Sequence, residues 1–165
     1  MGGKTGASLM SDRLADWFPQ LTAGSYAVTS RAQFDYNCVA WALGETIRWW
    51  WPDESEVSYW PEGVRRHETL EAFVEAFRLF GFEECQNPDL EPGWQKIAIY
   101  GHEDGCPTHA ARQLADGTWT SKLGRLEDIS HANLDQLTGS AYGRPVLFLR
   151  RRRGRRASSP EEANP

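Results

Sequence analysis

The chain has 165 residues, of which 40% are hydrophobic and 25% charged, and its formal net charge is −5. A chain of this length buries roughly two-thirds of its unfolded surface in one core, so no disulfide is needed to stabilise it. The three cysteines follow no disulfide spacing, and no apolar run approaches the ~18 residues of a membrane span. These features exclude a disulfide-rich secreted domain and an integral membrane protein. We expect reduced thiols, a cytoplasmic location and no membrane partner.

Positive charge is concentrated near the C-terminus, in six arginines between residues 150 and 156. Residues 1–149 carry 12 basic and 21 acidic side chains, a net charge of −9, which repels nucleic acid. The arginine run is compatible with contact to a polyanion or with a solvated tail. We predict a disordered N-terminus over residues 1–10, a single domain over 11–150, and a disordered tail over 151–165 that is first Arg-rich and then acidic.

Two helices are predicted in the first half of the domain, after a short helix near residues 12–18 and an extended piece at 26–28. Apolar residues recur at helical spacing between Cys38 and Ile47, with Asn37 as the N-cap. A second apolar stripe spans residues 69–80, and a glycine directly after it is expected to end that helix.

In the second half of the domain, the residue pattern predicts strands at residues 96–100, 109–114, 119–123 and 145–149. A tight turn is expected at Ala115-Asp116-Gly117, and a short helix at 132–137 with Ser130 as a possible cap. Helices followed by an antiparallel sheet indicate the α+β class.

Cys38 is the candidate nucleophile. It falls in the first turn of its helix, where the helix dipole favours a thiolate and its own N–H can stabilise an oxyanion. A buried structural cysteine is the alternative. His109, about seventy residues later on a predicted strand, is the candidate general base, and a polar residue on the adjacent hairpin strand could hold its ring. Ser121 is the first choice for this residue, and Asp128 is the second.

The register of that hairpin decides which side chain faces His109. A two-residue turn places Lys122 on the histidine's face, whereas a three-residue loop beginning at Ala115 places Ser121 there. We predict the three-residue loop, because a lysine beside the imidazole would lower its pKa and oppose the imidazolium formed during attack.

The segment DYNCVAWA at residues 35–42, followed by the His109 hairpin, resembles the papain-like superfamily and most nearly its NlpC/P60-type branch. The resemblance implies a cysteine peptidase-like hydrolase with helices packed on an antiparallel sheet. It also suggests Gln33 as a papain-like oxyanion amide. Most of the chain further resembles an uncharacterised bacterial domain family with the pattern NC-x-AWALG…WWWP…YWP…THAARQL-x-DG-x-WTSKLG.

Eight tryptophans are present, and several cluster near Trp49, Trp50 and Trp60. They are candidates for stacking against a substrate, or they form an aromatic cap on the core. His102, Cys106 and His109 lie close in sequence but match no common zinc spacing. We therefore predict no metal and no cofactor.

The leading hypothesis is a monomeric cysteine hydrolase that cleaves an amide or acyl bond in a peptide, a glycopeptide or a small amide. The alternatives are a non-catalytic binding module with a tryptophan-lined groove and a toxin- or immunity-type interaction protein.

Overall fold

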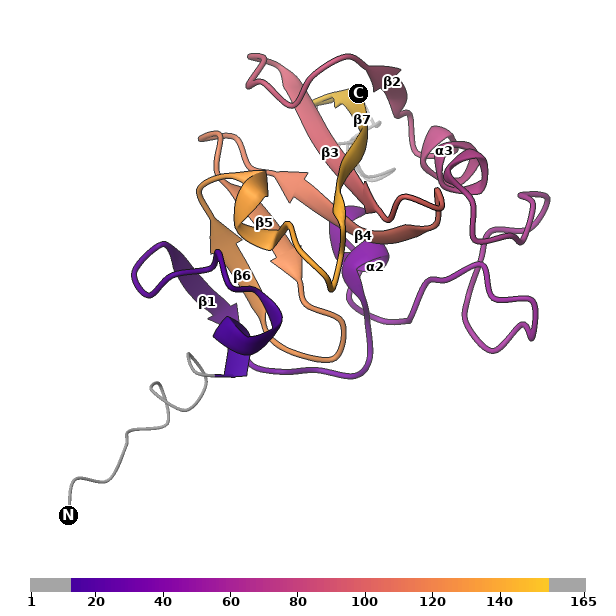
Figure 1. Cartoon of the computed structure of the whole chain (residues 1–165). Coiled ribbons are helices and arrows are strands. Elements are labelled where there is room, and N and C mark those ends of the chain that lie inside the picture. Colours follow the sequence, from indigo (N-terminus) through magenta and orange to yellow (C-terminus); the bar gives the residue numbers. More distant parts are fainter. Residues whose placement is uncertain (1–12, 155–165) are drawn as a thin grey trace, which may run out of the picture.

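The computed structural model describes residues 13–154 and contains a seven-stranded antiparallel sheet with a small number of helices (Figure 1). The α+β class is therefore confirmed. The termini expected to be disordered lie largely outside the described residues. After a short helix at residues 13–17, the elements are β1 (Tyr26–Ser30), α2 (Cys38–Ala42), α3 (Leu70–Arg78), β2 (Glu83–Cys85), β3 (Trp94–Gly101), β4 (Pro107–Gln113), β5 (Trp119–Lys122), β6 (Asp128–His131), the 3-10 helix η1 (Leu134–Leu137) and β7 (Arg144–Arg152).

The strands are ordered β1-β6-β5-β4-β3-β7-β2 across the sheet, and every neighbouring pair is antiparallel. Strands β3 to β6 follow one another as a meander. The first strand closes one side of this meander, and the last strand lies between β3 and β2 on the other. The strands that carry His109 and Ser121, β4 and β5, are thus central rather than at an edge.

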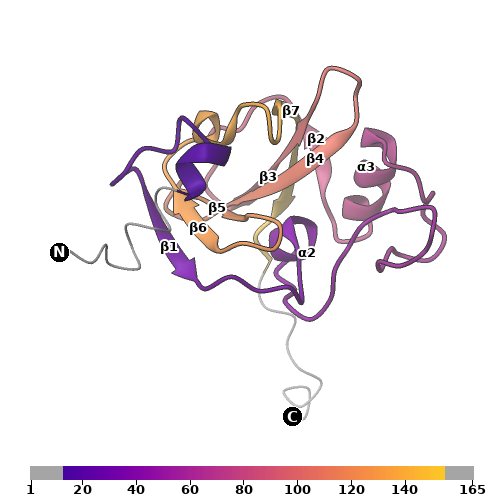
Figure 2. The same cartoon turned by 60° about the horizontal axis from the view of Figure 1, so that its bottom comes forward.

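Both faces of the sheet are covered, as the alternation along β3 shows. Ile97 and Ile99 pack into a core cluster with α2 and α3, whereas Ala98 and Tyr100 pack into a second cluster with η1 and the segment around residues 13–21. Successive side chains of a strand point to opposite faces, so one strand supplies both clusters. Figure 2 shows α2 on the opposite side of the sheet from the helix at residues 13–17.

The helix that begins at Cys38 is shorter than predicted. It ends at Ala42, because Gly44 takes a positive φ of 80° that terminates the turn. Ile47, which the periodicity placed on the buried face, is 77% exposed. The second helix is confirmed: Thr69 caps α3 by accepting the N–H of Ala72 at 3.2 Å.

Two short strands, β2 and β6, were not predicted. Ser130 lies inside β6 and is not a helix cap. Asn133 takes that role for η1, in a capping box with Gln136. The consequence for the site is that β6 brings a further histidine, His131, beside β5.

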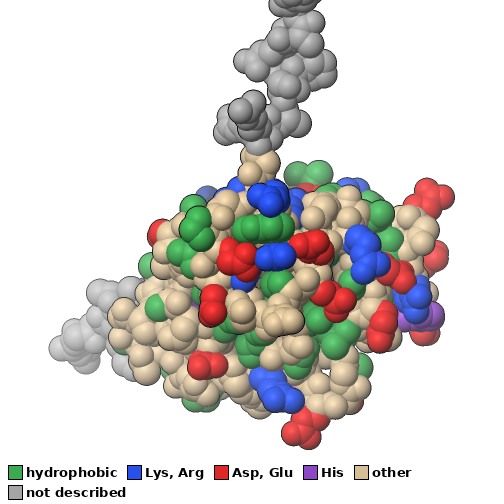
Figure 3. Space-filling view, turned by 90° about the horizontal axis from the view of Figure 1, so that it is seen from above, with side chains coloured by type: hydrophobic (Ala, Val, Ile, Leu, Met, Phe, Trp, Pro, Cys, Tyr) green, Lys and Arg blue, Asp and Glu red, His purple; other side chains and the backbone are tan. Residues whose placement is uncertain are grey.

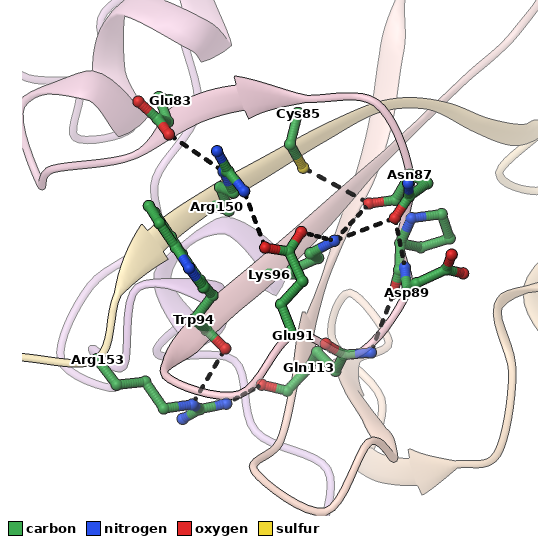
Figure 4. A network of polar contacts seen from close by, with 11 residues as sticks. Glu83, Cys85, Asn87, Asp89, Glu91, Trp94, Lys96, Gln113, Arg150 and Arg153 are labelled. Atoms are coloured by element: carbon green, nitrogen blue, oxygen red, sulfur yellow. Dashed lines mark hydrogen bonds and ion pairs between the residues drawn. The ribbon is translucent and has the colours of Figure 1, made fainter.

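The last strand continues to Arg152, so the prediction that it ends near Leu149 is wrong. Arg150 pairs with Glu83 and with Glu91, at 3.1 and 2.8 Å, and Glu91 also pairs with the fully buried Lys96 at 2.8 Å (Figure 4). Figure 3 shows basic and acidic side chains side by side on this end of the molecule. The first arginines of the run are therefore part of the folded domain.

Candidate functional site

Asn37 fixes the start of the helix that carries Cys38. Its Oδ1 accepts the N–H groups of Ala40 and Trp50 at 3.3 and 3.1 Å, and its Nδ2 donates to the carbonyl of Trp50 at 2.6 Å. The predicted N-cap is confirmed. In addition, the same amide joins the helix to the tryptophan-rich segment, which places that segment beside Cys38.

Cys38 is only 5% exposed, and burial raises the pKa of its thiol to about 11. The N–H groups of Ala110, Val39 and Cys38 itself, together with the charge of Lys122, act in the opposite direction without cancelling this effect. The expectation of a lowered pKa is therefore wrong. The helix has only five residues, so its dipole is too short to outweigh desolvation.

His109 is fully buried on β4. The ring of Tyr142 stacks on its imidazole with centroids 4.2 Å apart, and Tyr100 contacts it edge-on. Its Nε2 lies 2.9 Å from Ser121 Oγ, whereas its Nδ1 is buried without a hydrogen-bond partner among the described residues. Burial lowers the pKa of His109 well below 6.5, and the nearby His131 lowers it further. The imidazole is neutral at pH 7.

The register prediction for the hairpin is confirmed. Arg112 pairs with Thr120, and Leu114 N–H donates to Thr118 O across a three-residue loop. This pairing puts Ser121 on the face of His109. Ser121 Oγ also lies 2.9 Å from His131 Nε2, a contact that no sequence pattern indicated.

The side chain of His109 lies with its strand partner Tyr100 on the face of the sheet opposite the cluster that contains Cys38. Cys38 contacts β4 where β4 separates from β5. The pairing of these strands ends at Arg112 and Thr120, which leaves the N–H of Ala110 free to approach Cys38 Sγ. Ala110 directly follows His109 in the chain. In the part of the chain that the structure describes, Sγ makes no hydrogen bond to the imidazole. The thiol thus contacts the backbone beside His109, and both groups are neutral.

A cavity of about 290 Å³ opens beside Cys38. Its lining is aromatic or uncharged and consists of Asn37, Cys38, Trp49, Trp51, Thr108, Gly124 and Tyr142. Of the predicted substrate-binding tryptophans, Trp49 is therefore at the cavity, whereas Trp50 and Trp60 are core residues, 1% and 4% exposed. Alternation along the Trp49–Trp51 run explains this result, since its first and third members share one side. That alternation could have identified Trp51, but no sequence signal indicated Tyr142.

The remaining candidates lie elsewhere. Asp128 accepts hydrogen bonds from the hydroxyls of Thr29, Ser30 and Tyr36, so its carboxylate is engaged away from His109. Gln33 contributes its backbone carbonyl to Lys122 at 2.8 Å, and it is not among the residues that line the cavity. Neither residue fits the role that the sequence suggested for it.

All three cysteines are free. Within residues 13–154, no group of three or more His, Cys, Asp or Glu side chains is arranged to hold a metal ion. No helix in this range has the length and apolarity to cross a membrane.

A family model described as a domain of unknown function (DUF7689) matches residues 27–150. The chain belongs to this family, which confirms the expectation of an uncharacterised domain family. Comparisons with curated proteins and with solved structures gave no match.

Proposed function

We propose that this DUF7689 domain is a cysteine hydrolase with a papain-like arrangement, in which Cys38 is the nucleophile and His109 the general base. One observation carries the proposal. A buried imidazole has one nitrogen held by Ser121 and the other without a partner, and the N–H of the next residue, Ala110, contacts the thiol of Cys38, which lines a cavity. A buried polar atom without a partner destabilises a fold, whereas a general base needs such a free lone pair.

The proposed reaction starts from a neutral pair. As Cys38 Sγ attacks the substrate carbonyl carbon, His109 Nδ1 takes the thiol proton and the carbonyl oxygen becomes an oxyanion near the Cys38 N–H. The proton then passes to the leaving amine or alkoxide, and a thioester remains on Cys38. Water attacks the thioester, His109 takes a proton from that water and returns it to the leaving thiolate, and the acid is released.

The raised pKa of Cys38 and the lowered pKa of His109 favour this sequence over a preformed thiolate. Charge separation in a desolvated site is costly, so proton transfer accompanies attack rather than preceding it. The step requires Cys38 Sγ and His109 Nδ1 to come within hydrogen-bond distance of each other when substrate binds, as catalytic hydrogen bonds often tighten only then.

The cavity indicates the substrate class. No charged side chain is among its lining residues, and Trp49, Trp51 and Tyr142 provide aromatic surface. A free carboxylate or ammonium would lose its hydration there without a partner. We therefore propose an amide or ester with a neutral, preferably aromatic or apolar, group beside the scissile bond. A peptide, a glycopeptide or a small amide can supply such a group.

Acylation by 4-nitrophenyl esters tests the proposal. We expect 4-nitrophenyl phenylacetate to acylate Cys38, with the adduct located by peptide mass spectrometry. Cys38→Ala should abolish the reaction, and His109→Ala should slow it by roughly 10²–10⁴-fold. Cys106→Ser, which removes an exposed thiol, is the matched control and should react like the wild type. Acylation at Cys106 alone, or an unchanged rate in His109→Ala, would refute the assignment.

A second candidate function, a non-catalytic binding module, is favoured by the raised thiol pKa and the absence of a thiol–imidazole hydrogen bond in the described residues. It predicts that a neutral aromatic amide quenches tryptophan fluorescence equally in the wild type and in Cys38→Ala, without turnover. Trp51→Ala should weaken that binding in either case.

A further inference from the structure

We infer that His131 on β6 is a positioning residue that fixes the tautomer of His109 through Ser121. The inference deepens the proposed function and rests on it for its catalytic meaning. No catalytic or orienting role was expected for His131 from the sequence. It is 2% exposed, and it lies one strand beyond Ser121 in the sheet.

The direction of each hydrogen bond in this series follows from the group at its end, the backbone carbonyl of Asn133. The carbonyl of Asn133 can only accept, and it lies 2.9 Å from His131 Nδ1, so that nitrogen carries a hydrogen. Burial lowers the pKa of His131, and the ring is neutral at pH 7. A neutral imidazole carries one N–H, so His131 Nε2 is an acceptor.

Ser121 then has only one arrangement that satisfies both neighbours. Its single hydroxyl hydrogen donates to His131 Nε2 at 2.9 Å, so its oxygen accepts from His109 Nε2, also at 2.9 Å. His109 therefore carries its hydrogen on Nε2, and Nδ1 keeps a free lone pair. This is the nitrogen without a partner and the one assigned as the base.

Without His131, the direction of the hydrogen bond between Ser121 and His109 would not be fixed. Its hydroxyl could donate to His109 Nε2, which would move the imidazole hydrogen to Nδ1 and leave no acceptor for the thiol proton. A carboxylate in place of His131 would also fix the tautomer, but its charge would stabilise the imidazolium. A neutral histidine fixes the tautomer and leaves the pKa of His109 low.

Long-range ¹H–¹⁵N spectra of the full chain with ring-labelled histidine measure the tautomers directly at pH 7.5. The four histidines are assigned by single His→Gln variants. In the wild type we expect hydrogen on Nε2 of His109 and on Nδ1 of His131. In His131→Leu, His109 should populate the Nδ1–H form. His131→Gln should retain the wild-type tautomer, because its amide can donate to Asn133 and accept from Ser121. His67→Gln, at an exposed site, is the control.

Hydrogen on Nδ1 of His109 in the wild type would overturn the inference without any variant having to fold. So would an unchanged His109 tautomer in a folded His131→Leu protein. Acylation of Cys38 separates the two proposals: we expect it to fall on the order of 100-fold in His131→Leu and to recover in His131→Gln. The expected tautomers without acylation in the wild type support the relay and refute the hydrolase. Equal acylation in the wild type and His131→Leu refutes the relay and leaves the hydrolase standing.

Discussion

Acid should destabilise the domain through its two buried imidazoles. Burial and the charge of His131 lower the pKa of His109 well below 6.5, and burial lowers the pKa of His131. In the unfolded chain both pKa values return to about 6.5, so below that pH the unfolded state binds more protons than the folded state. The free energy of unfolding is therefore at its full value above about pH 6.5 and decreases as the pH falls.

The size of the effect follows from burial. At pH 5.5, an imidazole that is protonated only after unfolding lowers the free energy of unfolding by about 1.4 kcal/mol. His109, with no exposed surface, contributes this amount in full. His131 contributes less, since its bond to the Asn133 carbonyl acts to raise its pKa. We expect the free energy of unfolding to be about 1.5–2.5 kcal/mol lower at pH 5.5 than at pH 7.5.

Urea unfolding, followed by tryptophan fluorescence at pH 7.5, 6.5 and 5.5, measures this difference. His109→Gln should remove about half or more of the pH dependence, whereas His67→Gln, at an exposed site, should leave it unchanged. The carboxylates with lowered pKa values, Asp53, Glu91 and Asp116, act mainly below about pH 4.5, outside this window. Equal stability at pH 7.5 and 5.5, or equal slopes for the wild type and His109→Gln, would refute the burial argument.

Three further outcomes are expected. Asn37→Ala removes three hydrogen bonds at a buried cap and should lower the free energy of unfolding by about 3 kcal/mol, measured in urea; a loss below 1 kcal/mol would contradict that role. Ending the chain after Leu149 should lower Tm because it removes the end of β7 and its ion pairs, whereas ending it after Gly154 should leave Tm unchanged in calorimetry. Iodoacetamide should modify Cys38 with a rate that rises about tenfold per pH unit from pH 7 to 10; a plateau near neutral pH, seen by mass spectrometry, would show a thiolate instead.

Local signals in the sequence were sufficient where a single physical preference decides the outcome. Asn37 was identified as a cap because an asparagine directly before a helix commonly accepts a hydrogen bond from a free N–H group of the first turn. The loop at residues 115–117 fixed the register that puts Ser121 against His109, and this followed from the chemistry of the imidazole rather than from strand propensity. These predictions concern neighbours in the chain or across one hairpin.

The remaining features depend on contacts that are distant in sequence. The protonation state of Cys38 is set by burial under the sheet, which the helix pattern does not reveal. His131 was missed because β6 has only four residues and is held by pairing with β1 and β5. Trp50 and Trp60 are core residues because they pack with α3. No local sequence pattern indicates which segments α3 packs against.

The distribution of polar groups in the core bears on whether the site is functional. A core serving stability alone would saturate or omit polar atoms, because a buried group without a partner costs about 1–3 kcal/mol. Here three polar side chains saturate one another from Asn133 inward, and within this series only His109 Nδ1 lacks a partner; it is one of six such buried side-chain atoms in the described residues. That atom is the only one in the series that could accept a proton without breaking a hydrogen bond. A free lone pair on a buried imidazole is what a base requires and what packing alone would disfavour.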